Sequence, residues 1–253
     1  MDHLNQIIAI AEQAGQAILE VYQQDNAAFN ITGKADDSPL TAADLASHQL
    51  IVKALQLLTP DLPILSEEAA DISWDIRQTW SRYWLVDPLD GTKEFIKRNG
   101  EFTVNIALIE DGEPVMGVIH APVLNKTYYA AKGAGAFVKT EAGVTAANVS
   151  QPGAVIRVVG SRSHPSPELA DYLAQFPQHD MVPVGSSLKF CLVAEGAADV
   201  YPRFGPTMQW DTGAGHIIAL EAGATVRFDG ISDKVYQREN LRNPGFIVSA
   251  LQG

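Results

Sequence analysis

The order of the apolar patterns along the chain is the feature that most constrains its fold. Apolar residues recur at spacings of three and four over residues 3–24 and again over 41–58, which predicts two amphipathic helices. Short apolar segments follow, and the pair Asp111-Gly112 between two of them is typical of a hairpin turn. From residue 155 onward, strand patterns alternate with helical ones. This order predicts an α/β fold with layered sheets.

One stretch of the chain carries no clear pattern. Residues 140–154 are small, polar and punctuated by glycine and proline, so we expect a domain boundary there, between residues 1–145 and 146–253. The predicted strands cover residues 62–66, 83–86, 102–109, 115–120, 127–131, 155–159, 181–184, 199–201, 225–227 and 245–249. The predicted helices in the second part cover residues 167–175, 187–195 and 212–222.

Composition and charge limit the possible functions. The chain has 253 residues, 46% of them hydrophobic and 19% charged, so it can bury a large core and is not expected to be disordered. The formal net charge of −12 argues against nonspecific nucleic-acid binding, which needs a basic surface. A small anionic substrate remains compatible with this charge where metal ions or local basic side chains offset the field.

The sequence contains one cysteine, Cys191, and so offers neither an intrachain disulfide nor a cysteine-rich metal site. No basic segment followed by an apolar stretch opens the sequence, and no run approaches the ~18–20 apolar residues of a membrane span. These features predict a cytoplasmic protein without a transmembrane segment. They leave open a peripheral attachment to the cytoplasmic side of the inner membrane, and they do not determine the oligomeric state.

The most informative acidic segment is Asp-Pro-Leu-Asp-Gly-Thr at residues 87–92, which directly follows an apolar strand. On a turn stiffened by proline, its two carboxylates can point at one place, and the Leu89 carbonyl adds a third oxygen. Oxygen ligands of this kind suit Mg²⁺. The pair Glu67-Glu68 ends a second apolar strand, where alternation allows only one of the two to share a site. Separately, both segments are also compatible with ordinary surface charges.

Two further aspartates stand at predicted helix starts. The segment Thr41-Ala42-Ala43-Asp44 has the spacing of a capping box, and Asp211 lies where an N-cap is expected. Capping alone would account for both residues. If the helix starts face the carboxylates, Asp44 could also act beside the metal, and Asp211 could bind a cation while its helix faces a phosphate. The small residues at 213–215 allow a close approach there.

A set of basic residues stands in otherwise acidic sequence. Its members are Lys93, Arg162, Lys189 and Arg203. Each is compatible with a plain surface charge, and Ser186 or Ser187 with a cap for the helix that carries Lys189. The sequence contains no catalytic-triad spacing, Walker loop, dinucleotide fingerprint or histidine-based zinc motif.

Together these segments resemble the lithium-sensitive, magnesium-dependent phosphatase superfamily that includes the inositol monophosphatases. The signatures are the Glu-Glu pair at 67–68, the turn at 87–92 and the helix start Trp-Asp-Thr-Gly-Ala-Gly at 210–215, which follow the family's order. Within the superfamily, the chain most resembles the 3′(2′),5′-bisphosphate nucleotidases of the CysQ type. That narrower resemblance is carried by residues 34–44, 90–95, 160–164, 187–191 and 201–208. The chain departs from the common pattern at Gly213 and Gln209.

The resemblance implies a layered α/β/α/β/α sandwich of the inositol monophosphatase and fructose-1,6-bisphosphatase type. It places the site between an N-terminal metal-binding half and a C-terminal substrate-binding half. It implies two or three Mg²⁺ ions, held by Glu67, Asp87, the Leu89 carbonyl, Asp90 and Asp211. It assigns orientation of the attacking water to Asp44 and Thr92. It assigns substrate contacts to the backbone N–H groups of Gly91 and Thr92 and to Ser186, Lys189, Arg203 and Asp211.

The implied activity is hydrolysis of 3′-phosphoadenosine 5′-phosphate to AMP and phosphate by a metal-activated water, with phosphoadenylyl sulfate as a further substrate. Lithium inhibition and a role in sulfur assimilation belong to the same implication. Two alternatives stay open: an inositol- or sugar-phosphate monophosphatase on the same scaffold, and a Mg²⁺- and nucleotide-binding sensor without activity. The basic residues would distinguish the first alternative, and a broken catalytic set would mark the second.

Overall fold

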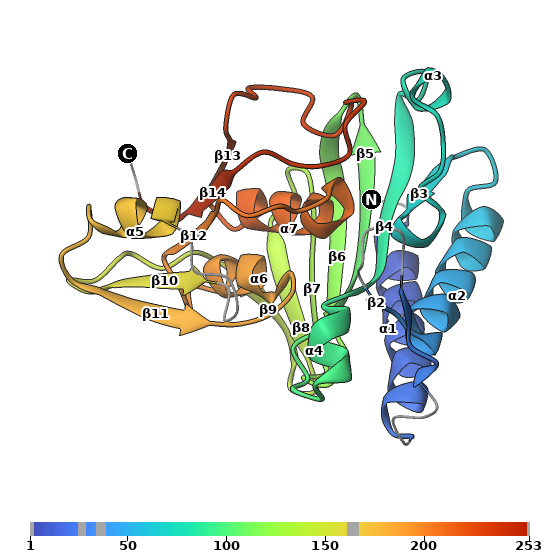
Figure 1. The fold of residues 1–253 in the computed structure, drawn as a ribbon, viewed down its shortest axis with the longest axis horizontal. Helices are drawn as coiled ribbons and strands as arrows, with labels where there is room; N and C mark the ends of the chain where they lie inside the picture. Colours follow the sequence, from blue (N-terminus) through green and yellow to red (C-terminus); the bar gives the residue numbers. More distant parts are fainter. Residues whose placement is uncertain (1–2, 25–28, 34–38, 161–166, 252–253) are drawn as a thin grey trace.

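The chain folds into alternating layers of helices and sheets (Figure 1). The computed structural model describes residues 3–24, 29–33, 39–160 and 167–251. Helices α1 (Leu4–Tyr22) and α2 (Ala42–Leu58) cover one face of a seven-stranded sheet. Helices α6 (Leu188–Ala194) and α7 (Gln209–Glu221) lie between this sheet and a five-stranded one, against which α5 (Pro167–Leu173) packs. The predicted layered α/β sandwich is confirmed.

The seven-stranded sheet follows the chain order. Its strands are β3 (Ile64–Ser66), β4 (Arg82–Asp90), β5 (Thr103–Glu110), β6 (Glu113–Ala121), β7 (Lys126–Ala131), β8 (Ala136–Thr140) and β9 (Gly143–Ala147). Strand β3 pairs with β4 in parallel, and each later neighbour pairs antiparallel. Because helices cover both faces of β4, β5 and β6, these strands are nearly continuous apolar runs.

The five-stranded sheet has the order β11-β10-β12-β14-β13. Its strands are β10 (Ile156–Gly160), β11 (His179–Pro183), β12 (Val200–Arg203), β13 (Thr225–Phe228) and β14 (Phe246–Ser249). Strand β10 pairs in parallel with β11 and β12, and β14 pairs antiparallel with β12 and β13. Short elements complete the fold: β1 (Thr32–Gly33), β2 (Pro39–Leu40), α3 (Trp74–Arg77) and α4 (Thr92–Ile96).

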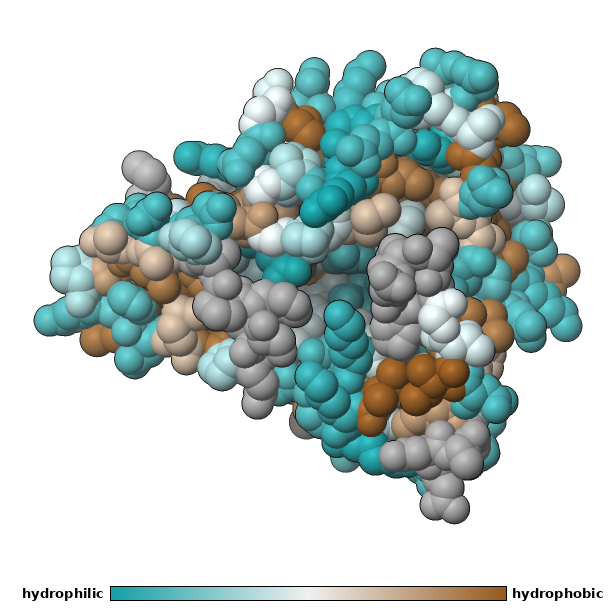
Figure 2. Space-filling model, in the orientation of Figure 1, coloured by the Kyte–Doolittle hydropathy of each residue, from teal (hydrophilic) through white to brown (hydrophobic). Residues whose placement is uncertain are grey.

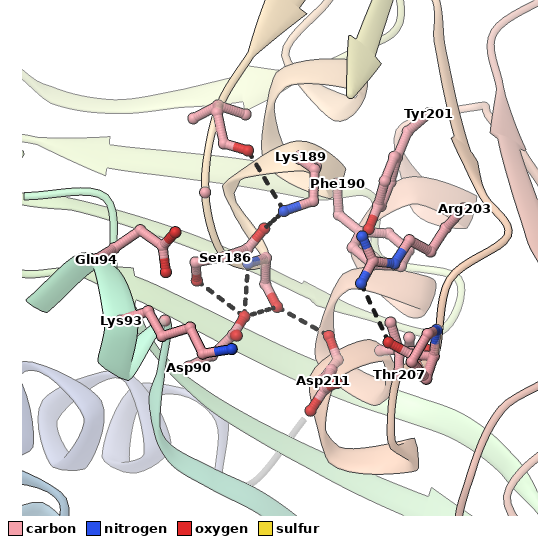
Figure 3. A pocket seen from close by; sticks show the side chains of 16 residues that line it. Asp90, Lys93, Glu94, Ser186, Lys189, Phe190, Tyr201, Arg203, Thr207 and Asp211 are labelled. Atoms are coloured by element: carbon pink, nitrogen blue, oxygen red, sulfur yellow. Dashed lines mark hydrogen bonds between the residues drawn. The ribbon is translucent and has the colours of Figure 1, made fainter. Parts of the chain in front are cut away.

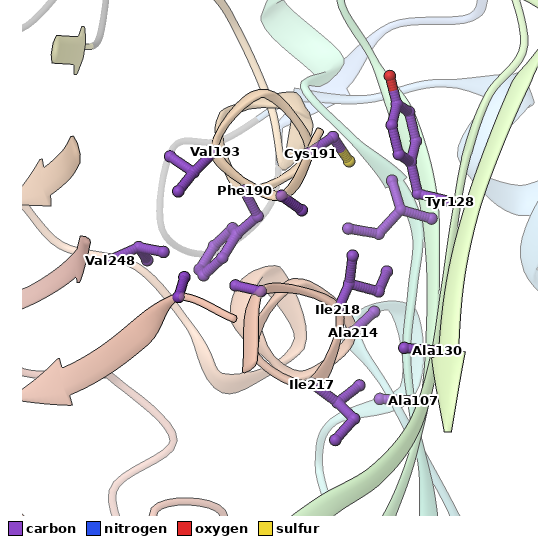
Figure 4. Close-up of a cluster of buried hydrophobic side chains, with 14 of the residues drawn as sticks. Ala107, Tyr128, Ala130, Phe190, Cys191, Val193, Ala214, Ile217, Ile218 and Val248 are labelled. Carbon is purple, nitrogen blue, oxygen red and sulfur yellow. The ribbon is translucent and has the colours of Figure 1, made fainter. Parts of the chain in front are cut away.

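Helix α7 is buried between the two sheets and joins their cores (Figure 4). On one side Ile217 and Ile218 face the seven-stranded sheet, where Ala107 and Ala130 leave room for them. On the other side α7 packs on α6, and Phe190 of α6 stacks on Phe246 of β14 with ring centroids 5.6 Å apart. The core therefore runs without interruption from one sheet to the other.

Glycines make this close packing possible. A Cβ atom on Gly117 of β6 would lie 2.6 Å from the Ala214 carbonyl oxygen of α7, and one on Gly213 would lie 2.9 Å from a Leu85 methyl group. A Cβ atom on Gly215 would overlap the ring of Phe190. The small residues at 213–215 thus serve helix packing, which differs from the expected close approach to a phosphate.

The structure corrects the expected boundaries in three places. Residues 140–154 contain β9, which pairs with an unpredicted β8; four of the five residues of β9 are exposed at the sheet edge, so no alternating pattern reveals it. The segment 87–90 is not a turn but the end of β4, with a local irregularity between Asp87 and Asp90. The pair Glu67-Glu68 lies in a 3₁₀ turn, Glu67–Ala69, that follows β3. The division at residue 145 stays a prediction.

We expect Gly215→Ala to lower the free energy of unfolding by about 1–3 kcal/mol, because the added methyl group overpacks the contact between α7 and Phe190. Urea denaturation measures the change. Gly153→Ala is the matched control, since a Cβ atom at Gly153 has only the Val155 carbonyl oxygen near it, at 4.0 Å. Equal stability of the two variants would contradict the packing role of Gly215.

Candidate active site

A polar cleft opens beside α4, α6 and α7 (Figures 2 and 3). Its cavity volume is about 160 Å³, and the cleft is open to solvent at its mouth. The expected residues Asp90, Gly91, Ser186, Lys189, Arg203 and Asp211 all line it. Glu67, Asp87, Leu89, Thr92 and Asp44 are not among its lining residues.

The end of β4 places the first group of carboxylates. Asp87 is 1% exposed, and its Oδ1 accepts a hydrogen bond from the Leu89 N–H at 3.1 Å. The irregular pairing with β5 ends at Asp90, and Gly91 then adopts a φ of 95°, in the left-handed region that favours glycine. This sharp change of direction starts α4 at Thr92. The strand end and the helix start are thereby brought to one edge of the sheet.

Asp44 caps α2 and also contacts the segment 87–92. Its Oδ2 accepts a hydrogen bond from the Thr41 N–H at 2.8 Å, while Thr41 Oγ1 accepts from the Asp44 N–H, so the capping box is present. Its Oδ1 lies 3.2 Å from Thr92 Oγ1, which donates to it. Ser47, one turn further along α2, donates to the Pro88 carbonyl at 2.7 Å. The start of α2 is therefore fastened to the segment 87–92.

Asp211 is the third residue of α7, not its N-cap as expected, because the helix begins at Gln209. Its Oδ2 accepts a hydrogen bond from the Met208 N–H at 2.8 Å, which still satisfies a donor at the helix start. Gln209 is fully buried and does not line the cleft. The departure from the family pattern at that position therefore lies inside the fold.

The buried carboxylates destabilise one another's charged forms. Burial is the largest cause that raises the pKa of Asp87 well above its ordinary value, followed by the charges of Glu67, Asp90 and Asp211. A hydrogen bond between the Asp87 and Glu67 side chains adds to this effect. Burial and the charge of Asp90 likewise raise the pKa of Asp211. Such a group of acids is costly unless protons or cations compensate the charge.

These residues fit a hard divalent cation by their chemistry. They offer carboxylate oxygens and the Leu89 carbonyl, the ligand type that Mg²⁺ takes. In the part of the chain that the structure describes, however, no three acidic, histidine or cysteine side chains are gathered as a closed metal site. The carboxylates would therefore have to rotate toward a bound ion. The assignment of individual ligands stays a prediction.

Two cations face the acids across the cleft (Figure 3). Lys189 is 8% exposed, and its Nζ donates to the Ser186 carbonyl at 2.5 Å. Burial lowers the pKa of Lys189 to about 8, although the charge of Asp90 acts in the opposite direction. Arg203 donates through Nη2 to the Pro206 carbonyl at 3.1 Å, while its buried Nε has no hydrogen-bond partner among the described residues. An incoming anion would supply that partner.

The cleft also contains Ser187, Glu94, Tyr201 and Thr207, which lie in the segments that carried the narrower resemblance but were not assigned to the site. Ser187 donates both its N–H and its hydroxyl to Asp90 Oδ2, at 2.6 Å each. The sequence suggested Ser187 only as a possible cap for the helix that carries Lys189. Residues 34–38 and 161–164, which include Arg162 and belong to the segments that supported the narrower resemblance, lie outside the described residues.

We expect Mg²⁺ at 100 times its dissociation constant to raise the thermal midpoint by about 5–10 °C over the EDTA-treated protein, since the ion relieves repulsion among the buried acids. Asp87→Asn should fold, lack activity and lose this shift. Differential scanning calorimetry measures the midpoints. The exposed Asp75 of α3 supplies the control, because Asp75→Asn should keep the full shift. An unchanged Mg²⁺ response in Asp87→Asn would contradict its role.

Comparison with known proteins finds relatives along nearly the whole chain. The sequence model of the inositol monophosphatase family matches residues 2–248. The 3′(2′),5′-bisphosphate nucleotidase CysQ of Salmonella typhimurium is 55% identical over 97% of this chain and 99% of that protein. CysQ of Escherichia coli strain K12 is 53% identical over the same shares. The crystal structure of CysQ from Bacteroides thetaiotaomicron has a TM-score of 0.86 and 42% identity, with 98% of each chain covered.

Proposed function

Because the chain belongs to the inositol monophosphatase family, we propose that it is a Mg²⁺-dependent 3′(2′),5′-bisphosphate nucleotidase. Its reaction is hydrolysis of 3′-phosphoadenosine 5′-phosphate to AMP and phosphate. One observation carries the proposal: the cleft joins a wall of carboxylates to a wall with two cations, Lys189 and Arg203. A substrate with two phosphate groups needs both walls. The names of the relatives at 55% and 53% identity support the same substrate class.

In the proposed site, Glu67, Asp87, the Leu89 carbonyl, Asp90 and Asp211 hold two or three Mg²⁺ ions. Bound there, Mg²⁺ neutralises phosphate charge and lowers the pKa of a water molecule. The raised pKa values of Asp87 and Asp211 support this assignment: burial is the largest cause in each, the charges of Glu67 and Asp90 add to it, and a cation would offset both effects. The net charge of −12 makes such compensation necessary for any anionic substrate.

Thr92 and Asp44 orient the attacking water. The Thr92 hydroxyl donates to Asp44 Oδ1 at 3.2 Å and lies 3.3 Å from the Leu89 carbonyl, so both neighbours accept its single proton. The oxygen of Thr92 is then left to accept a proton from water, which turns a water lone pair toward phosphorus. The backbone N–H groups of Gly91 and Thr92, at the start of α4, hold the scissile phosphate. The water oxygen forms a bond to phosphorus as the bond from phosphorus to the ribose 3′ oxygen breaks. The water gives up a proton and the 3′ oxygen takes one up, so that AMP and phosphate result.

Lys189, Arg203 and Ser186 bind the rest of the nucleotide. The buried Nε of Arg203 has no partner among the described residues and gains one from a phosphate oxygen. Lys189 is held by the Ser186 carbonyl close to the same space, so its charge is fixed in position before the substrate arrives. Asp211 lies between the carboxylates and the two cations, and it belongs to both the metal-binding and the substrate-binding residues.

The proposal divides the work between residues 1–145 and 146–253. The first part supplies Asp44, Glu67, Asp87 and Asp90, and the second supplies Ser186, Lys189 and Arg203. Asp211 belongs to the second part and yet completes the carboxylate set. The ligand set is therefore complete only when both parts are in place.

Among the described residues, no helix has both the length and the apolar character needed to cross a bilayer. We extend the proposal to a cytoplasmic location, to lithium inhibition and to a role in sulfur assimilation. All three rest on the resemblance to the family.

We expect kcat/KM for 3′-phosphoadenosine 5′-phosphate to exceed that for inositol 1-phosphate by about 100-fold or more, which corresponds to about 2.7 kcal/mol of transition-state discrimination. Phosphate release at equal low substrate concentrations with Mg²⁺ measures the ratio. A ratio near one would leave the metal chemistry in place and favour a monophosphatase. Tight binding of the nucleotide without turnover would favour a sensor.

We expect KM for the nucleotide to rise as the pH increases through about 8, where free Lys189 loses its proton. The charged form attracts phosphate and is complete below this pKa, so weaker binding appears only on the alkaline side. Initial rates from pH 7 to 9.5 give the profile. Lys189→Gln should have a KM at least about 10-fold higher at pH 7 without the alkaline rise. Lys53→Gln, on the exposed side of α2, should retain the unaltered profile.

A further inference from the structure

Two polar side chains stand inside the otherwise apolar strand β5, directly beneath the cleft. Thr103 and Asn105 are 0% and 1% exposed, and they lie on the same face of the strand because they are two residues apart. Asn105 Nδ2 donates to Ser187 Oγ at 2.9 Å and lies 3.4 Å from Asp90 Oδ2. Thr103 Oγ1 is 2.9 Å from Asn105 Oδ1 and 2.6 Å from Ser186 Oγ. Burying these groups is costly unless each has a partner.

The hydrogen-bonding capacity of each group determines the direction of this network. Asp90 Oδ2 accepts hydrogen bonds, so the Asn105 atom that faces it is the amide nitrogen. The amide oxygen then faces Thr103, whose single hydroxyl proton goes to it. Ser187 Oγ accepts from Asn105, and its own proton is directed to Asp90 Oδ2 at 2.6 Å or to the Asp211 carbonyl at 2.8 Å. Asn105 thus occupies one side of the Ser187 oxygen, so the Ser187 proton is left for these two acceptors.

The result is an asymmetric Asp90. The Ser187 N–H and the Asn105 amide donate to Oδ2, and the Ser187 hydroxyl lies 2.6 Å from it. The Ser186 hydroxyl divides its single proton between Oδ2 and Thr103 Oγ1. Oδ1 is left as the oxygen that can turn toward a cation. The same donors fix residues 186 and 187, which start α6 and carry Lys189 on its first turn. Ser186 has a φ of 55°, a strained value for a serine, and persists there because Thr103 and Asp90 hold its hydroxyl.

We infer that Asn105, oriented by Thr103, is a positioning residue that sets the metal-binding oxygen of Asp90 through Ser187. It touches neither substrate nor reacting atoms. The inference rests on the proposed function in that Asp90 is taken as a Mg²⁺ ligand. It adds that the affinity for Mg²⁺ depends on a buried amide in the neighbouring strand. Partners that orient metal ligands affect metal affinity or activity by about 10–100-fold when altered.

The test compares Asn105→Ala, Ser187→Ala and the double variant. Isothermal calorimetry measures Mg²⁺ affinity without nucleotide, steady-state kinetics measures kcat and KM, and the thermal midpoint is recorded in EDTA. We expect Asn105→Ala to weaken Mg²⁺ binding by about 10–100-fold and to lower kcat similarly at fixed subsaturating Mg²⁺. If Asn105 acts through Ser187, the double variant should bind Mg²⁺ no more weakly than Ser187→Ala alone. Additive losses would overturn the inference.

A second pair of variants covers the case in which Asn105→Ala does not fold. Thr103→Val keeps the volume of the side chain but removes the hydroxyl that orients the amide. Thr127 of β7 is the matched control, since it is also buried, at 2% exposure, and bonds His120 and Glu12 far from the cleft residues. Thr103→Val should weaken Mg²⁺ binding by about 3-fold or more, while Thr127→Val should lower only the thermal midpoint. Equal Mg²⁺ affinities in the two variants would overturn the inference.

The outcomes separate the inference from the proposed function. If the unaltered protein binds Mg²⁺ but does not hydrolyse 3′-phosphoadenosine 5′-phosphate, the function is wrong and the calorimetric comparison still decides the role of Asn105. If it hydrolyses the nucleotide and Asn105→Ala binds Mg²⁺ normally, only the positioning role is wrong. A protein that binds no Mg²⁺ overturns both.

Discussion

The hydrogen bonds to Asp90 Oδ2 connect the parts of the molecule that form the cleft. Asp90 ends β4 of the seven-stranded sheet, while Ser186 and Ser187 begin the helix that packs on the second sheet. Each bond to a carboxylate is stronger than one between neutral groups. The carboxylate wall and the cation wall are therefore held at a defined separation by the same side chain. Loss of this contact would release Lys189 and disturb the acids together.

A second constraint is electrostatic. The protein places several carboxylates in buried surroundings although its overall charge is already strongly negative. Without a compensating cation this arrangement opposes folding, since charges of one sign repel most strongly where water is excluded. The same repulsion would provide affinity for a metal ion, and this accounts for the presence of several buried carboxylates. A cation bound at these residues would therefore stabilise the fold, in keeping with the way that perturbed acids gather at functional sites.

The sequence predicted the elements that carry strong apolar periodicity, and it failed where the signal was local. The long helices α1 and α2 and the apolar strands β5 to β7 were found at nearly their observed bounds, whereas β4 was predicted only as far as residue 86 and extends to Asp90. The exposed edge strand β9 was missed, because its residues meet solvent and show no alternation. The candidate acids were recognised from their motifs, but Thr103 and Asn105 were not. The sequence shows only that two polar residues lie on one face of an apolar strand. Their role becomes clear from their hydrogen bonds to Ser186 and Ser187, which precede α6.

Asp44 shows that a residue which caps a helix can also make a second contact. A carboxylate has two oxygens, and here one closes the start of α2 while the other contacts Thr92. The sequence allowed Asp44 to cap α2 and also to act beside the metal; the cap is confirmed, and the second role stays a prediction. Asp211 divides its groups in a similar way, since its side chain bonds Met208 and its carbonyl accepts from Ser187.

The burial of α7 between both sheets has a consequence for how the chain unfolds. Its glycines bring β6 and α6 so close that the helix belongs to both cores at once. Separation of either sheet from α7 would expose apolar surface of the helix and so weaken its packing against the other sheet. The two parts should therefore lose their structure in one cooperative transition, without an intermediate in which one sheet persists alone. A shared helix of this kind turns two sheets with different tasks into a single folding unit.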